Sequence, residues 1–225
     1  MSQDKVVEDF HKHVYEVASE GKSWGGASYF GVKLWKWPCD LHNYQELIYE
    51  LRPALIIETG TAFGGSALYF AHLLDQIGSG KVLSIDLKEI DRNYPLHPRI
   101  AYWGSRSSVD PQVIREVTAY HAACGCPPKT QGGSGRPCLV VLDSDHSKAH
   151  VLRELEFYST LVSPNSWLVV EDTNLNGHPV YEDFGPGPQE ALEAWLPRHS
   201  DFKAEVGRQT KYLFSMHTWL RRMRK

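Results

Sequence analysis

The sequence lacks the features that mark membrane, nucleic-acid-binding and disulfide-rich proteins. Its 225 residues carry 24 Lys and Arg against 27 Asp and Glu, a formal net charge of −3, so no basic field exists to attract nucleic acid or an anionic membrane. Apolar runs such as residues 138–142 are far shorter than the roughly 20 residues that a membrane-spanning helix needs. Four cysteines are too few for a disulfide scaffold in a chain of this length.

What remains is the composition of an ordinary globular protein, with 42% hydrophobic and 23% charged residues. Residues 1–9 contain no apolar core of the kind that a signal peptide requires. We therefore expect a cytoplasmic protein with reduced thiols, whose partner is a small molecule rather than nucleic acid or a membrane. A homo-oligomer is compatible with the aromatic N-terminal segment, which could line a subunit interface.

Short apolar segments alternate with helical patterns after residue 53. Strands that are apolar throughout and alternate with helices indicate a parallel sheet covered on both faces. We therefore predict an α/β fold with a doubly wound, mostly parallel sheet and a C-terminal antiparallel hairpin from residues 202–206 and 211–215. Residues 1–50 are predicted to be a helical lead-in packed on the core, and residues 51–225 the main body of a single domain. The predicted parallel strands are residues 54–60, 81–86, 99–103, 138–143 and 166–172.

Two smaller expectations concern the start of a helix and the C-terminal basic residues. Asp40 is placed to cap a helix that runs through Leu51. The basic residues Arg221, Arg222, Arg224 and Lys225 are expected to form a solvated tail.

Polar residues gather where the first two predicted strands end, which is where ligands bind in a doubly wound sheet. The loop from Gly60 to Gly65 has the spacing G-x-x-x-G-G, and glycines let backbone approach a ligand at a helix N-terminus. Asp86 ends the next strand, where an acid suits ribose hydroxyls. This pair predicts an adenosine-type cofactor, but it does not separate a nicotinamide cofactor from S-adenosylmethionine (SAM).

Three carboxylates follow the fourth and fifth strands: Asp143, Glu171 and Asp172. Converging carboxylates repel unless a cation neutralises them, and Mg²⁺ binds a few carboxylates while keeping positions open for substrate. His146, three residues after Asp143, could accept a proton near neutral pH. Neighbouring strand residues face opposite ways, so Glu171 and Asp172 reach one ion only if the strand has ended, and Asp145 is the alternative ligand. The combination predicts methyl transfer to oxygen.

These motifs resemble those of a known family. The loop Glu58-x-Gly60-x-x-x-Gly64-x-Ser66 and the pair Asp143-x-x-His146 are similar to motifs of metal-dependent O-methyltransferases of the catechol O-methyltransferase type, whose base is lysine rather than histidine. More closely, the chain resembles the cephalosporin hydroxylase-like family, which includes rhamnosyl O-methyltransferases. The segments that carry this resemblance are Trp35-x-x-Pro38-x-Asp40-Leu41, Pro53-x-Leu55-Ile-Ile-Glu-Thr-Gly-Thr61, Gly64-Gly-Ser-Ala67, His97-Pro-Arg-Ile100, Asp143-Ser-Asp-His146, Val170-Glu-Asp-Thr173 and Phe184-Gly-Pro-Gly-Pro188.

The resemblance implies a Rossmann-like methyltransferase fold that uses SAM and Mg²⁺ on a hydroxyl of a small sugar-like or natural-product acceptor. It implies that Glu58 contacts the methionine end of SAM, Ser66 its carboxylate, and Ser105 the region of the adenine. The full set of expected SAM-binding residues is Glu58, Gly60, Thr61, Gly64, Ser66, Asp86, Ser105 and Asp143. The expected metal ligands are Asp143, Glu171 and Asp172, the expected catalytic residues Asp143 and His146, and the residues expected near the acceptor His178 and Tyr181.

Two other functions stay open at this point. One is a nicotinamide-dependent oxidoreductase on the same fold, which would not need an acidic metal cluster. The other is a non-catalytic accessory protein of a biosynthetic pathway. The segment 124–136, rich in Cys, Pro and Gly, is expected to be a surface loop with reduced thiols, since the spacing of Cys124, Cys126 and Cys138 matches no zinc pattern.

Overall fold

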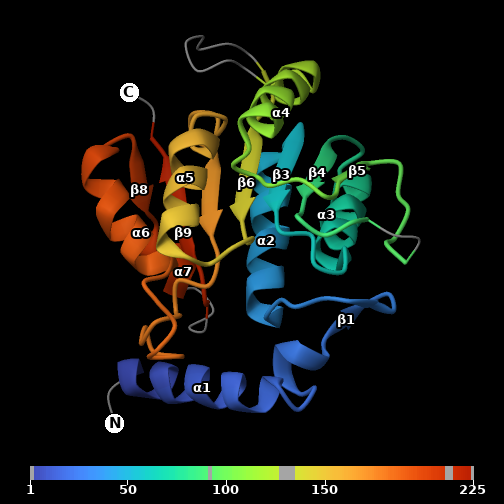
Figure 1. The fold of residues 1–225 in the computed structure, drawn as a ribbon. Coiled ribbons are helices and arrows are strands. Elements are labelled where there is room, and N and C mark those ends of the chain that lie inside the picture. Colours follow the sequence, from blue (N-terminus) through green and yellow to red (C-terminus); the bar gives the residue numbers. More distant parts are fainter. Residues whose placement is uncertain (1–2, 91–92, 127–134, 211–214, 224–225) are drawn as a thin grey trace.

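A mixed sheet of seven strands forms the centre of the computed structural model, which describes residues 3–90, 93–126, 135–210 and 215–223 (Figure 1). The strand order is β5-β4-β3-β6-β7-β9-β8, and only the pairs made by β9 are antiparallel. The prediction of a doubly wound, mostly parallel sheet is therefore confirmed. The strands are β3 (Leu55–Thr59), β4 (Lys81–Ile85), β5 (Ile100–Trp103), β6 (Cys138–Leu142), β7 (Trp167–Val170), β8 (Phe202–Ala204) and β9 (Thr218–Arg222).

Helices cover both faces of this sheet, because alternate side chains of each strand point to opposite sides. On one face the strands pack with α4 (Pro111–Ala123), α5 (Lys148–Tyr158) and α6 (Pro188–Trp195). On the other face they pack with α2 (Pro38–Leu51) and α3 (Gly65–Gln76). Smaller elements are η1 (Ser23–Gly26), the two-stranded ribbon of β1 (Ser28–Tyr29) and β2 (Val32–Lys33), η2 (Leu196–Arg198) and α7 (Val206–Thr210).

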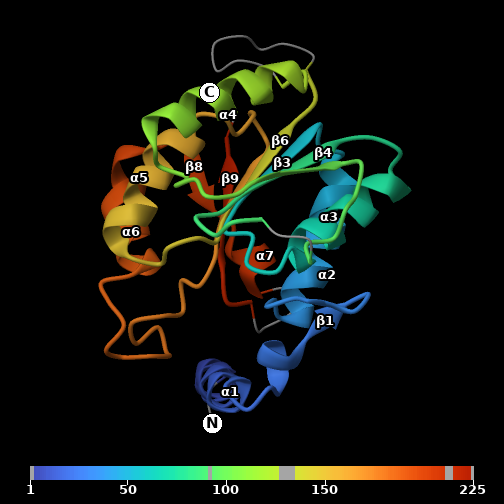
Figure 2. The same ribbon diagram turned by 45° about the vertical axis from the view of Figure 1, so that its right-hand side comes forward.

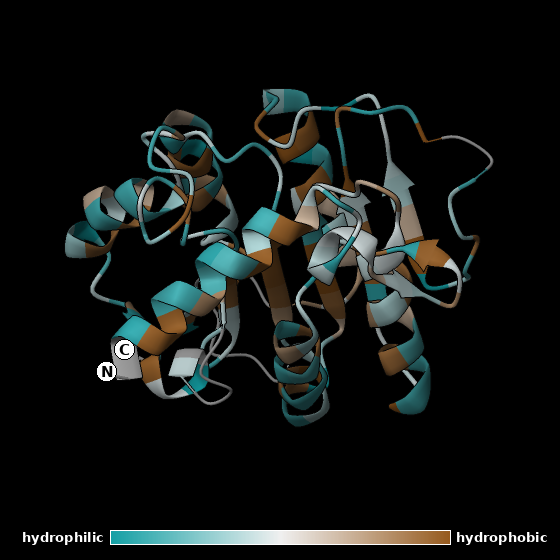
Figure 3. Ribbon diagram, turned by 90° about the horizontal axis from the view of Figure 1, so that it is seen from below, coloured by the Kyte–Doolittle hydropathy of each residue, from teal (hydrophilic) through white to brown (hydrophobic). Residues whose placement is uncertain are grey.

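Helix α1 (Gln3–Ala18) lies across the carboxyl ends of the parallel strands (Figures 1 and 2). Val14 and Tyr15 are buried in a small apolar cluster with Leu175, which follows β7, and Met216, which precedes β9. The view from below shows hydrophilic residues along much of the helix's outward surface (Figure 3). The helix is thus amphipathic, and its apolar side covers the carboxyl edge of the sheet, where ligands bind in doubly wound folds.

The start of α2 differs from the expectation. Trp37 is the N-cap and Pro38 the first helical residue, whereas Asp40 lies inside the first turn and is fully buried. Its carboxylate accepts hydrogen bonds from the Ser215 hydroxyl (2.6 Å) and the Met216 amide (3.4 Å). The prediction that Asp40 caps this helix is therefore wrong, because proline already supplies a first residue that needs no amide partner.

The antiparallel C-terminal pair is confirmed, but its second strand is β9, later in the chain than predicted. Residues 206–210 form α7, and residues 211–214 of the predicted second strand lie outside the described residues. Arg221 and Arg222 belong to β9, and Arg222 is 9% exposed, with its guanidinium near Asp201 (3.4 Å) and donating to the Val162 carbonyl. The expectation of a solvated tail is thus wrong for these two residues. Within the described part of the chain, no helix has the length and apolarity to span a membrane.

Candidate active site

A cavity of about 650 Å³ opens at the carboxyl ends of the parallel strands, within the size range of small-molecule sites. One side is built by the loop after β3 and by Asp86, at the end of β4. The opposite side is built by the turns that follow β6 and β7, and aromatic residues from three segments close it. These aromatic residues are Tyr15, Trp24, Trp35, Trp37, Phe63, Tyr181 and Phe184.

The loop after β3 approaches the end of β6 so closely that it requires glycine. Gly60 has φ +88°, and a Cβ built on it would lie 1.8 Å from the backbone oxygen of Asp143. Gly64, at the N-cap of α3, also has a positive φ (+78°), and its Cβ would lie 2.9 Å from Pro95. The glycines thus bring the predicted cofactor loop directly beside the predicted metal ligand Asp143. Thr61 and Ser66, predicted with them, also line the cavity.

Asp86 lines the cavity and anchors this loop. One of its carboxylate oxygens accepts the amides of Thr61 (2.8 Å) and Ala62 (3.0 Å), and the other accepts the amide of Lys88 (2.8 Å). Its contact with a ribose stays a prediction. Ser105 is exposed, has φ +57° and is not among the lining residues, but its neighbour Arg106 is.

Glu58 is fully buried at the end of β3, beneath the loop. Its Oε2 accepts a hydrogen bond from the Ser84 hydroxyl (2.7 Å), while Oε1 has no hydrogen-bond partner among the described residues. Burial raises the pKa of Glu58 to about 7, and the positive charge of Lys36 opposes part of that rise. An unpaired buried carboxylate oxygen is costly, so this side chain suits a ligand that carries a positive charge or a donor.

Asp143, His146 and Asp172 form a group whose ligand atoms all lie within 4.8 Å of one another; we call it the acid–histidine trio. His146 Nε2 lies 3.3 Å from an oxygen of Asp172 and 4.0 Å from one of Asp143. Strand β7 ends at Val170, and Asp172 adopts a left-handed conformation (φ +54°). Strand β7 has therefore ended before Asp172, as a shared site required, and the side chains that follow β6 and β7 meet.

Glu171 points elsewhere. Its Oε1 accepts a hydrogen bond from the Tyr44 hydroxyl (2.6 Å) and its Oε2 from the ammonium of Lys36 (2.5 Å). The charge of Lys36 holds the pKa of Glu171 at about 2, although burial alone would raise it. Asp145 is also outside the trio, and it accepts the backbone amide of Ser147 (2.7 Å). The geometry therefore separates Glu171 and Asp145 from the other predicted ligands.

Lys36 is the main site residue that sequence reasoning missed. It is 3% exposed, and its ammonium lies 2.5 Å from an oxygen of Asp143 as well as 2.5 Å from Glu171. Burial lowers the pKa of Lys36, but the charges of Asp143 and Glu171 outweigh burial and hold it above its usual value. A signal was available, since converging carboxylates need a cation and Lys36 lies in the apolar Trp35–Trp37 segment.

His217 is a second residue that the sequence did not reveal. It lies just before β9, is 4% exposed, and accepts the amide of Asp172 at Nδ1 (3.1 Å). Its Nε2 therefore carries the proton and faces Asp40 (3.3 Å) and Glu171 (3.6 Å). On the other side, the hydroxyl of Tyr15 lies 3.4 Å from Asp172. The trio thus rests on a buried layer of charged and hydrogen-bonded groups.

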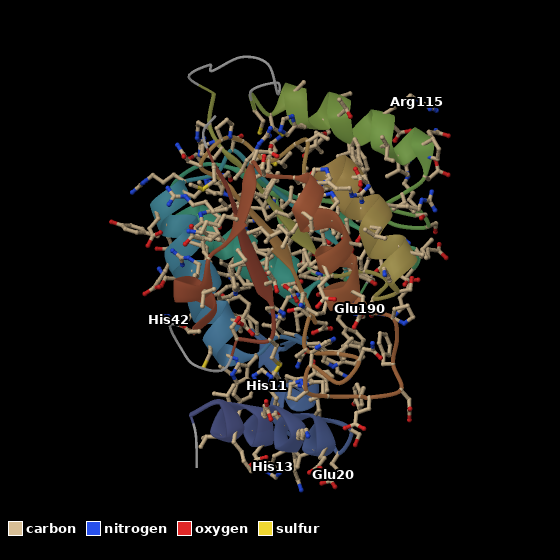
Figure 4. The ribbon with its side chains drawn as sticks, turned by 90° about the vertical axis from the view of Figure 1, so that its left-hand side faces the viewer. His11, His13, Glu20, His42, Arg115 and Glu190 are labelled. Atoms are coloured by element: carbon tan, nitrogen blue, oxygen red, sulfur yellow. The ribbon has the colours of Figure 1, made fainter. Side chains whose placement is uncertain are left out.

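The two residues predicted near the acceptor have different positions. Tyr181 lines the cavity, is 53% exposed, and packs edge-on against Tyr15 with ring centroids 5.3 Å apart. His178 is not among the lining residues, and its Nε2 lies 2.7 Å from Glu190 on α6. Figure 4 shows Glu190 on the side of the molecule where α6 meets the turns after β7. Only Tyr181 is thus brought to the site.

The sheet order, the glycine loop and the cavity at the carboxyl edge define a Rossmann-like methyltransferase fold. The apo structure of CmcI aligns with a TM-score of 0.62 at 19% identity, covering 88% of this chain and 77% of that one. A CmcI structure with Mg and SAM gives a TM-score of 0.62 at 18% identity, with the same coverage. MycE methyltransferase from the mycinamycin biosynthetic pathway, in complex with Mg, SAH and mycinamycin VI, gives 0.54 at 16% identity, covering 94% and 53%.

Sequence comparison narrows this class to one family. The chain belongs to the family described as Rhamnosyl O-methyltransferase/CmcI, whose model matches residues 22–223. The rhamnosyl O-methyltransferase of Mycobacterium tuberculosis is 38% identical over 213 residues, which are 93% of this chain and 81% of that protein. The Mycobacterium leprae protein of the same name is 36% identical over 218 residues, covering 96% and 89%. The family resemblance expected from the motifs is therefore confirmed.

Proposed function

We propose that this protein is a SAM-dependent and Mg²⁺-dependent O-methyltransferase that acts on a hydroxyl of a small sugar-like or natural-product acceptor. The observation that carries the proposal is the position of the acid–histidine trio, in one cavity with the glycine loop. The curated relatives named rhamnosyl O-methyltransferase support a sugar hydroxyl as the methyl acceptor.

The residues of the loop fit SAM. The unpaired oxygen of Glu58 suits the ammonium of its methionine end, and Ser66, at the start of α3, would contact its carboxylate. Asp86 would also accept hydrogen bonds from ribose hydroxyls, because its carboxylate oxygens can accept more hydrogen bonds than the loop amides donate. SAM supplies the transferable methyl group when it is bound.

The residues of the trio fit Mg²⁺. Asp143 and Asp172 offer the carboxylate oxygens that this ion prefers, whereas the imidazole of His146 suits softer metals. Glu171, already held by Lys36 and Tyr44, would orient Asp143 through Lys36 rather than bind the ion. Mg²⁺, when bound, supplies a positive charge that lowers the pKa of the acceptor hydroxyl.

His146 is left to accept the proton of that hydroxyl at Nε2, the nitrogen that faces both carboxylates. Asp172, 3.3 Å away, would stabilise the imidazolium that results, and His217 fixes the backbone of Asp172. The aromatic residues Tyr15, Tyr181 and Phe184 would exclude water and orient the acceptor, so that oxygen and methyl carbon are held close and in line.

The test measures methyl transfer from SAM to a methyl rhamnoside by mass spectrometry, with calorimetric titration of SAM in parallel. We expect EDTA and Asp143→Asn to abolish turnover while SAM affinity stays largely unchanged, and His146→Gln to lower kcat by about 100-fold or more. Asp145→Asn is the matched control, because Asp145 lines the same cavity but holds only its own turn.

The metal mechanism would be refuted if EDTA left turnover unchanged and Asp143→Asn and Asp145→Asn had the same turnover rate. The same titrations with NAD and NADP test the oxidoreductase alternative. SAM binding without turnover on any sugar or polyol would favour the accessory function.

A further inference from the structure

Three buried side chains meet at the opposite edge of the sheet from the cavity. They are His121 in the last turn of α4, Cys126 shortly after that helix, and Cys138, the first residue of β6. Each is at most 5% exposed, and their ligand atoms lie within 4.8 Å of one another. We call them the thiol cluster. Figures 1 and 4 show α4, which carries Arg115, at the end of the molecule away from α1.

The orientation of His121 is the feature that distinguishes this cluster from thiols packed in an apolar core. Its Nε2 lies 3.0 Å from the backbone carbonyl oxygen of Leu161 and donates to it. The other ring nitrogen, Nδ1, then carries the lone pair. Histidines that bind metals are usually held in this way, with the second N–H donated to a carbonyl or a carboxylate.

We propose that His121, Cys126 and Cys138 bind a thiophilic metal ion of the Zn²⁺ type, with the thiol of Cys124 available from the same turn as a fourth ligand. Two thiolates and an imidazole are the ligand types that such ions select over the oxygen ligands of Mg²⁺.

The distances are compatible with this assignment. Neighbouring ligand atoms of a tetrahedral zinc site are roughly 3.5–3.8 Å apart, given bonds of about 2.3 Å to sulfur and 2.0 Å to nitrogen. The cluster's limit of 4.8 Å is within about 1 Å of that spacing, so small side-chain rotations close the site.

The charges around the cluster come from its own thiols and from two nearby cations. Cys124 is half-buried and interacts electrostatically with both Cys126 and Cys138. Burial and the neighbouring Cys126 raise the pKa of Cys124 and Cys138, whereas the hydrogen bond with Cys138 lowers the pKa of Cys126. Arg136 lowers the pKa of Cys126 further, and Lys81 opposes part of the rise at Cys124. Three thiolates, one imidazole and Zn²⁺ carry a net charge of −1, which these cations offset.

Binding changes protonation and not oxidation state. Each thiol that becomes a ligand loses one proton to the buffer, and no electron is transferred. A site with four protein ligands has no open position for substrate, so its role is structural. It would join the end of α4 to the start of β6. This edge of the sheet lies opposite the cavity, so the ion would stabilise the fold and take no part in the reaction.

The test counts zinc in the purified protein by mass spectrometry and records the visible spectrum after apo protein is loaded with Co²⁺ under reducing conditions. We expect about one equivalent of zinc per chain in the unmodified protein and a thiolate–Co²⁺ charge-transfer band. Cys126→Ser and His121→Gln should lose both signals. Removing the metal with a chelator should lower Tm by roughly 5 °C or more, except in these two variants.

Two variants serve as controls. Cys39→Ser removes a half-buried thiol on α2, outside the cluster, and should keep the full zinc content. Asp143→Asn should also keep it, which shows that the counted metal is not in the acid–histidine trio. Absence of stoichiometric metal after reconstitution would overturn the proposal, and so would an intact mass two hydrogens low with a Cys126–Cys138 cross-link. Circular dichroism of His121→Gln separates loss of metal from loss of fold.

Discussion

Replacement of Lys36 by methionine tests the buried charge arrangement beneath the site. The substitution keeps an unbranched side chain that is one heavy atom shorter, and it removes the ammonium, which lies 2.5 Å from both Asp143 and Glu171. Buried Glu171 and half-buried Asp143 then lie close together without a cation. Removing one partner of a buried ion pair costs about 3–5 kcal/mol, because the remaining charge is left uncompensated.

The assay is urea unfolding in the absence of divalent metal, with the free energy obtained by linear extrapolation. A loss of that size corresponds to a fall in Tm of roughly 6–20 °C for a chain of this length. Lys33→Met is the matched control. Its ammonium lies over the rings of Trp35 (4.6 Å) and Phe63 (4.9 Å), and such a contact contributes only about 0.5–1 kcal/mol.

Two further measurements separate charge from packing. Adding Glu171→Gln to Lys36→Met should recover part of the lost stability, because one of the two uncompensated charges is then gone. Mg²⁺ should stabilise Lys36→Met more than the unmodified protein, since it would supply the missing positive charge. If Lys36→Met unfolds within about 1 kcal/mol of Lys33→Met, the buried ion pairs do not stabilise the protein and the reasoning fails.

Three other predictions follow from single side chains. The pKa of Glu58 is raised to about 7, above its unfolded value of 4.5, so its contribution to stability is complete below pH 4.5 and is lost as pH rises through 7. Glu58→Gln should therefore remove a decline of about 3 kcal/mol in the unfolding free energy between pH 5 and 8, measured without SAM; an unchanged decline would contradict this. Gly60→Ala places a methyl 1.8 Å from a backbone oxygen and should cost more than about 3 kcal/mol or prevent folding. Gly31→Ala, with a similarly positive φ but open space, should cost about 1 kcal/mol, and equal costs would rule out the steric argument. Tyr181→Ala should raise KM for the acceptor, while His178→Ala should lower stability by at most about 1 kcal/mol, because its contact with Glu190 is exposed, and should leave KM unchanged; the reverse pattern would place His178 at the acceptor.

The sequence allowed the sheet and part of the site to be predicted, because both depend on local patterns. Apolar runs marked the five parallel strands, and the carboxyl ends of parallel strands share an edge, which brought Asp143 and Asp172 together. The position of β9 in the chain was predicted too early, at residues 211–215, because its residues Thr218–Arg222 mix apolar and charged side chains. A strand at the sheet's antiparallel end has no continuous apolar run to mark it.

The residues that support the site were harder to predict. Lys36 and His217 lie in segments without periodicity, and they reach the site only through tertiary packing. Lys36 is 107 residues from Asp143 in the chain, and His217 is 45 residues from Asp172. The separation of Glu171 from Asp172 depends on one left-handed residue, which no pattern in the sequence marks. Side chains that complete a buried charge network are thus fixed by tertiary structure, not by motifs.

The place of β9 between β7 and β8 also has a consequence for the order of folding during synthesis. Because β9 follows every other sheet strand in the chain, β7 and β8 both have unpaired edges until it is made. Synthesis delivers the N-terminal parts first, so the nascent chain carries a nearly complete parallel sheet whose exposed edge can pair with other chains. His217 arrives with β9, so the backbone of Asp172 gains its support at the same moment as the edge is closed. Protection from aggregation and completion of the site are therefore a single late event.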